Sequence, residues 1–127
     1  MKAVMDTSVI VSGHPPTVDD DDLYVTAVTF AELQAGVLLA SNDADRARRL
    51  RRLTVLAALY NPLPVDAGVA IAFGRINAEM TGRNRRRPAG PMDLLIAATA
   101  LANGCRLYTC KVGGFQGLEA VLEVVQV

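Results

Sequence analysis

The chain is short of the residues on which several common catalytic sites depend. It has one histidine, His14, two cysteines and no tryptophan in 127 residues. A Ser-His-Asp triad or a Cys/His zinc site therefore has too little material. If Cys105 and Cys110 lie on one strand, their Cα atoms are about 16 Å apart at roughly 3.3 Å per residue, beyond disulfide reach. Two isolated thiols favour a reducing compartment, so we expect a cytoplasmic protein.

Long apolar runs are also absent. No run approaches the roughly 18 residues that a membrane helix needs, and Asp6 interrupts the place where a signal peptide would have its apolar core. Hydrophobic residues still make up 51% of the chain and charged residues 20%. This composition argues against disorder and suits a single domain over residues 1–127. It also leaves room for an apolar surface patch, and hence for a partner or a homodimer.

The net charge is zero, but the charges are grouped. Arginine supplies eleven of the thirteen cations, and its guanidinium suits bidentate contact with phosphate. Two segments are rich in it, Arg46 to Arg52 and Arg83 to Arg87. The alternative is that both are solvated helix or loop surface.

The order of apolar runs and breaks predicts strands that alternate with helices. Strands are expected at 2–5, 23–26, 63–65, 106–109 and 121–127, the last of which is alternatively in part the end of a helix. Helices are expected at 7–13, 29–40, 42–59, 66–80 and 92–102, with a polar loop at 81–90. Short connections between alternating elements predict an α/β sandwich, in which helices cover a mostly parallel central sheet.

Three acids stand in apolar surroundings near helix starts: Asp6 in AVMDTSV, Glu32 in TFAELQAG and Asp93 in GPMDLLIAA. If these junctions share one edge of the sheet, the carboxylates converge, and like charges so close are costly unless a cation neutralises them. Oxygen ligands suit Mg²⁺ or Mn²⁺. A metal on carboxylates beside arginine clusters indicates phosphodiester hydrolysis.

Each acid also has a purely structural explanation. Asp6 and Asp93 can cap the helices that follow them. Glu32 can complete a capping box with Thr29, the hydroxyl residue three positions earlier. Three helix caps would need no metal, so both interpretations are open at this point.

Four short blocks carry a resemblance to a known family. They are DTSV at 6–9, TFAEL at 29–33, MDLLIAATAL at 92–101, and LYT at 107–109 followed by Phe115. In order and spacing they are similar to the PIN-domain ribonucleases, most closely to the VapC toxins of bacterial toxin–antitoxin pairs. The resemblance implies a three-layer α/β/α sandwich, a homodimer, a Mg²⁺- or Mn²⁺-dependent endoribonuclease acting on RNA, and inhibition by a VapB-like antitoxin. It assigns catalysis and metal binding to Asp6, Glu32 and Asp93.

One segment departs from the pattern of that family. After the last LYT block, the family usually has an Asn and an Asp where this chain has Lys111 and Gly114. A cation there reduces the attraction for a second metal and could instead hold a substrate phosphate. We therefore expect one-metal chemistry and weak activity. The residues expected to bind RNA are Lys111 and the loop arginines Arg83, Arg85, Arg86 and Arg87.

Two other functions fit parts of the sequence. A non-catalytic PIN-like module that binds RNA or an antitoxin would explain Lys111 and Gly114. A phosphotransferase with Asp6 as nucleophile, as in haloacid-dehalogenase-like enzymes, would need a second Asp two residues later, where this chain has Ser8. The leading hypothesis is a metal-dependent endoribonuclease toxin.

Overall fold

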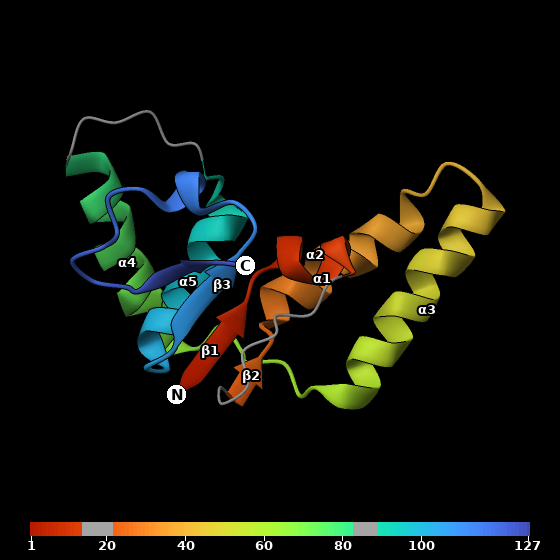
Figure 1. The fold of residues 1–127 in the computed structure, drawn as a ribbon, viewed down its shortest axis with the longest axis horizontal. Coiled ribbons are helices and arrows are strands. Elements are labelled where there is room, and N and C mark those ends of the chain that lie inside the picture. The colour runs from red at the N-terminus through yellow and green to blue at the C-terminus, as the bar shows by residue number, and fades with distance from the viewer. Residues whose placement is uncertain (14–21, 83–88) are drawn as a thin grey trace.

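The centre of the fold is a parallel four-stranded sheet in the order β2-β1-β3-β4 (Figure 1). The computed structural model describes residues 1–13, 22–82 and 89–127. The strands are β1 (Lys2–Met5), β2 (Asp22–Tyr24), β3 (Arg106–Thr109) and β4 (Val124–Gln126). The strands predicted at 2–5 and 106–109 are confirmed, and the expected runs at 23–26 and 121–127 overlap the two edge strands. The strand predicted at 63–65 is wrong, because Leu63 forms only an isolated bridge to Thr26.

Five α-helices and one 3-10 helix are present in the described residues. They are α1 (Thr7–Ser12), α2 (Ala27–Leu38), α3 (Asp43–Leu59), α4 (Ala67–Gly82), α5 (Pro91–Ala102) and η1 (Val112–Phe115). None of the described helices is both long and apolar enough to span a membrane.

The side chains of the central strands alternate between two apolar clusters. Val4 and Leu107 pack with residues of α4 and α5, whereas Met5 and Tyr108 pack with residues of α1, α2 and α3. This is the period of two that a strand imposes on its side chains. Figure 1 shows α4 and α5 on one side of the sheet and α1, α2 and α3 on the other. The predicted three-layer α/β/α sandwich is therefore confirmed.

The predicted capping box of α2 is wrong. The helix begins at Ala27, and its N-cap is Thr26, whose hydroxyl accepts a hydrogen bond of 3.2 Å from the Thr29 backbone N–H. Thr26 and Thr29 are both suitable caps, and the chain uses Thr26, which also forms the isolated bridge to Leu63. Glu32 thus lies within the helix and has no capping role.

Asp93 is not a cap either. The N-cap of α5 is Gly90, and Pro91 begins the helix, as proline often does. Asp93 lies in the first turn, where a carboxylate interacts favourably with the helix dipole. Two other helices have side-chain caps: the side chain of Asn42 caps α3, and Asp66 accepts a 3.0 Å hydrogen bond from the Val69 N–H at the start of α4.

Candidate active site

Asp6 directly follows β1 and is almost fully buried, with 4% of its surface exposed. Its side chain caps α1 by accepting hydrogen bonds from the N–H groups of Ser8, at 2.8 Å, and Val9, at 3.4 Å. Its Oδ1 also accepts from the Ser8 hydroxyl. The other oxygen, Oδ2, accepts a 2.6 Å hydrogen bond from Thr109 Oγ1 at the end of β3. The capping role is confirmed, but it does not account for this contact between strands.

Glu32 is half-buried on α2 and faces the start of α1. The hydroxyl of Thr7 donates a 2.8 Å hydrogen bond to Glu32 Oε1 and lies 3.0 Å from the Thr29 hydroxyl. The residue after Asp6 therefore orients the second acid of the predicted trio.

Asp93 is half-buried in the first turn of α5. Among the described residues, its carboxylate has no hydrogen-bond or ion-pair partner. Like Glu32, Asp93 is therefore not explained as a helix cap, and within the described residues no contact of its carboxylate explains it either.

The three carboxylates line one cleft of about 440 Å³. They reach it from different elements: Asp6 from the end of β1, Glu32 from α2 and Asp93 from α5. Lys111 and Gly114 line the same cleft. The structure thus brings the predicted acids together with the two positions that depart from the family pattern. The arginines predicted to bind RNA, Arg83, Arg85, Arg86 and Arg87, lie outside the described residues.

The donor set suits a hard divalent cation. Carboxylate oxygens are the ligands that Mg²⁺ and Mn²⁺ prefer, and three of them open into one cleft. In the part of the chain that the structure describes, however, no three Asp, Glu, His or Cys side chains are grouped so that they could hold a metal ion. Both Asp6 oxygens and one Glu32 oxygen already accept hydrogen bonds. The residues fit the ion by chemistry and location, and side chains would have to turn to bind it.

Sequence reasoning missed the role of Thr109. Its hydroxyl donates to Asp6 and accepts a 3.0 Å hydrogen bond from the Lys111 N–H. Ser8 bridges similarly, because its hydroxyl contacts Asp6 and accepts a 3.0 Å hydrogen bond from the Cys110 N–H. The sequence signal was present in the hydroxyl residues that follow each strand, but only the pairing of β1 with β3 shows that they meet.

Comparison with known proteins agrees with this geometry. The family profile described as PIN domain matches residues 3–110. The chain is similar to Ribonuclease VapC4 of Mycobacterium tuberculosis, with 34% identity over 113 residues covering 85% of each chain, and to Ribonuclease VapC5 of that organism, with 33% identity covering 98% of this chain and 94% of the relative. Among solved structures it is similar to VapBC-5, a member of the VapBC family of toxin–antitoxin systems from the same organism, with a TM-score of 0.82, 32% identity and 99% and 98% of the two chains covered. The chain therefore belongs to the PIN-domain family and, within it, to the VapC proteins.

Proposed function

We propose that this chain is the toxin of a VapBC-type toxin–antitoxin pair, an endoribonuclease that hydrolyses RNA phosphodiester bonds with Mg²⁺ or Mn²⁺. The observation that carries the proposal is the single cleft lined by Asp6, Glu32 and Asp93. Relatives named as ribonucleases support the reaction class. A similar solved structure from a VapBC system supports a VapB-like antitoxin as partner. A homodimer in the cytoplasm belongs to the same proposal.

The three acids of the site differ in how many hydrogen bonds hold their carboxylates in place. Asp6 is fixed by Ser8 and Thr109, so it can serve as a rigid anchor for an ion. Glu32, oriented by Thr7, and Asp93, which has no partner among the described residues, would complete the ligand set. The ion, when bound, would supply Lewis-acid chemistry, polarising the phosphoryl oxygen and activating water.

Lys111 has a separate role in this proposal. It lines the cleft and is exposed, and its ammonium group has no partner among the described residues. It can therefore neutralise a non-bridging oxygen of the substrate phosphate, which would otherwise be repelled by the acids.

A second function, a PIN-like module that binds RNA or antitoxin without cutting, is favoured by one observation. The cleft has a cation at Lys111 and no side chain at Gly114, so it carries less negative charge than the family pattern provides. With weak metal affinity, such a protein would bind RNA or an antitoxin but would not cleave RNA.

A manganese titration followed by RNA cleavage separates the two functions. We expect cleavage that depends on manganese in the parent protein, is lost in Asp93→Asn and is retained in Asp43→Asn, which changes an exposed acid at the start of α3. RNA binding without cleavage at any manganese concentration would favour the non-catalytic module. Equal activity of Asp93→Asn and the parent would contradict the assigned site.

A further inference from the structure

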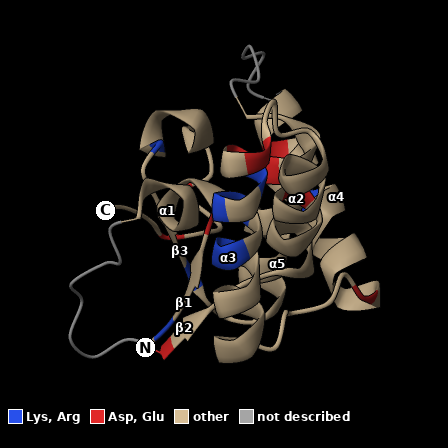
Figure 2. Ribbon diagram, turned by 90° about the vertical axis from the view of Figure 1, so that its right-hand side faces the viewer, with Lys and Arg blue, Asp and Glu red and all other residues tan. Residues whose placement is uncertain are grey.

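A second cavity, of about 500 Å³, adjoins the candidate active site. Thr7, Val11 and Glu32 line both cavities, so Glu32 stands in the wall between them. The remaining lining comes from α2 and α3: Leu33, Gly36, Arg48, Arg49 and Arg52. The acidic cleft thus continues into a space whose far wall is basic. Figure 2 shows that the basic residues of α3 gather in the half of the helix nearer its N-terminus.

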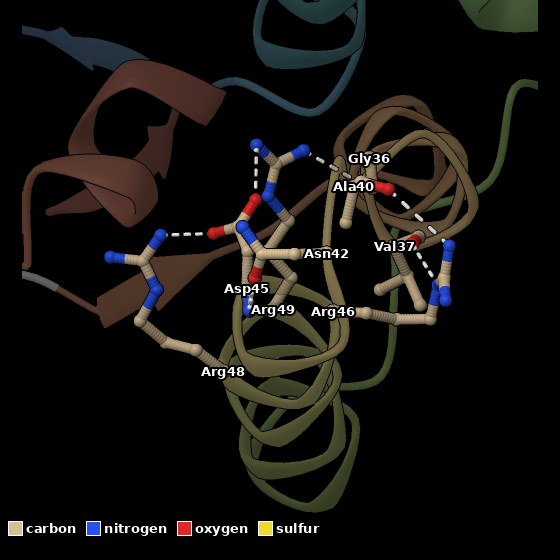
Figure 3. A network of polar contacts seen from close by, with 8 residues as sticks. All are labelled: Gly36, Val37, Ala40, Asn42, Asp45, Arg46, Arg48 and Arg49. Atoms are coloured by element: carbon tan, nitrogen blue, oxygen red, sulfur yellow. Dashed lines mark hydrogen bonds and ion pairs between the residues drawn. The ribbon is translucent and has the colours of Figure 1, made fainter.

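Two of the three lining arginines are already paired. Asp45 forms ion pairs with Arg48 and, at 3.0 Å, with Arg49 (Figure 3). Arg49 also donates a 2.8 Å hydrogen bond to the Gly36 carbonyl and so fixes α3 against α2. The hydrogen bond from Arg48 holds the pKa of the Asp45 carboxyl below its usual range, so Asp45 is charged at neutral pH. These contacts hold the basic wall in place.

Arg52 is the unpaired member. It is half-buried, lines the cavity one helical turn beyond Arg48 and Arg49, and has no hydrogen bond or ion pair within the described residues. Three arginines face one lining acid, Glu32, and even with Asp45 counted the wall keeps an excess positive charge. A partly enclosed guanidinium that has no ion-pair partner in the described part of the chain is suited to an anion from outside, and its planar fork matches phosphate.

We propose that this arginine-lined cavity binds a backbone phosphate of the RNA strand that flanks the scissile phosphate, with Arg52 as the main contact. The inference rests on the proposed ribonuclease function and names where its substrate extends. When the reacting phosphate of an RNA strand lies beside Glu32, the carboxylates of the cleft repel the neighbouring phosphates. Those phosphates are therefore best placed in a region of positive charge. The cavity that contains Arg52 adjoins the cleft at Thr7 and Glu32, which line both.

Arg51 provides a matched control, because it directly precedes Arg52 on α3, is exposed and does not line the cavity. Binding of fluorescent oligouridylates of increasing length is measured by anisotropy without divalent metal. For the longer strands we expect Arg52→Gln to weaken binding about tenfold, the range for a hydrogen bond to a charged group. The slope of log affinity against log salt should become shallower by about 0.7. For the shortest strands Arg52→Gln should match the parent, and Arg51→Gln should match the parent throughout.

Arg52→Lys tests the geometry of the contact. Lysine keeps the charge but loses the bidentate fork, so we expect the parent salt slope with part of the affinity lost. Thermal unfolding of each variant checks that α3 is intact.

Several outcomes overturn the proposal. If Arg52→Gln binds RNA as tightly as the parent protein and the parent protein cleaves RNA, the proposed phosphate subsite is refuted and the ribonuclease function stands. Equal losses in Arg52→Gln and Arg51→Gln reduce the effect to general electrostatics. Arg52-dependent binding of polyglutamate but not of oligouridylate would assign the cavity to an acidic protein segment. A parent protein that neither binds nor cleaves RNA refutes the proposed function and this inference together.

Discussion

Thr109 Oγ1 donates a 2.6 Å hydrogen bond to Asp6 Oδ2 and thereby joins the ends of two neighbouring strands. The same oxygen accepts from the Lys111 N–H at 3.0 Å. One buried hydroxyl therefore positions both the first acid of the cleft and the backbone of the residue that brings a cation into it.

Replacing Thr109 by Val keeps the shape of the side chain and removes this donor. We expect the free energy of unfolding to fall by about 1–3 kcal/mol, since a buried carboxylate oxygen loses its partner. Cleavage should fall as Asp6 loses its fixed orientation. Thr99→Val is the control, because Thr99 is equally buried but only donates to the Leu95 carbonyl within α5. Denaturant unfolding and RNA cleavage are compared for both variants, and equal losses of activity would contradict the positioning role.

The variants Asp6→Asn and Asp93→Asn should differ in thermal stability when no metal is present. With manganese they should behave alike, because each lacks one of the expected metal ligands. Asp93→Asn should lower the free energy of unfolding by no more than about 0.3–1 kcal/mol, the range for a charge in the first turn of a helix. Its carboxylate neither caps a helix nor has a partner among the described residues. Asp6→Asn keeps an acceptor for the cap but directs an amide toward the Thr109 hydroxyl, so a larger loss is expected.

Added manganese supplies the readout for that pair of variants. An ion that binds only the folded state stabilises it by about 2.7 kcal/mol at a hundred times its Kd. We expect the parent Tm to rise with manganese and both variants to lose the rise. A rise preserved in either variant would exclude that residue as a ligand.

The acids could be predicted from the sequence because each stands in an apolar context, which is costly for a charge without a function. What could not be predicted was which alternative explanation held for each. Asp6 is both a cap and a cleft residue, whereas Glu32 and Asp93 are not caps, because the N-caps of α2 and α5 are Thr26 and Gly90. Local sequence alone does not decide which of several suitable residues caps a helix, and here the cap, Thr26, also forms the isolated bridge to Leu63.

The hydroxyl network and the basic cavity were beyond sequence reasoning for a different reason. Thr109 meets Asp6 only because β3 pairs with β1, and Arg52 adjoins Glu32 only because α3 packs against α2. Local periodicity places a residue on a face of its own element, but it does not say which other element faces it.

Two glycines allow the effect of backbone conformation on stability to be measured without a change in packing. A Cβ at Gly74, inside α4, or at Gly104, after α5, would meet no atom of the described residues within 4 Å. Gly104 has a φ of +66°, which side chains rarely adopt, and Gly74 lies within a helix. We expect Gly74→Ala to stabilise the protein by about 0.5–1 kcal/mol and Gly104→Ala to destabilise it by about 1 kcal/mol. Thermal unfolding measures both, and changes of the same sign would contradict the explanation.

The two cysteines are free and should react differently with alkylating reagents. Burial raises the pKa of the Cys105 thiol, with Lys2 opposing it weakly, so the unreactive thiol form persists as pH rises through the ordinary thiol range. Cys110 is half-buried and lines the cleft. We expect iodoacetamide to modify Cys110 first and to block cleavage, as mass spectrometry of partly labelled protein can show.

The sign of the pH effect on stability follows from the same burial. The folded state holds the Cys105 proton more tightly than the unfolded chain does. This contribution to stability is therefore present below the ordinary thiol pKa and is lost as pH rises above it. Cys105→Ala should remove that part of the alkaline loss, and an unchanged pH profile would refute the assignment.

The positions that depart from the family pattern lead to the last prediction. Lys111 and Gly114 both line the cleft of Asp6, Glu32 and Asp93. Among the described residues, a Cβ at Gly114 would meet only Ala89 Cβ, at 4.0 Å, which is ordinary contact, and no positive φ there demands glycine. The double substitution Lys111→Asn with Gly114→Asp is therefore compatible with the fold.

This double variant should bind manganese more tightly than the parent protein does. It removes one cation and adds one carboxylate, so the cleft becomes more negative by about two charges, and hard-cation affinity rises with ligand charge. If metal occupancy limits the rate, RNA cleavage rises in parallel. Calorimetry measures the metal affinity, and cleavage assays at several manganese concentrations measure the activity.

A parent protein that is already saturated at micromolar manganese and fully active would contradict this explanation. Lys111 would then contact the substrate phosphate without weakening metal binding, and Lys111→Ala should lower activity without changing metal affinity. Should neither protein bind metal or cut RNA, the non-catalytic module becomes the better description, because restoring the family's residues would then have restored nothing.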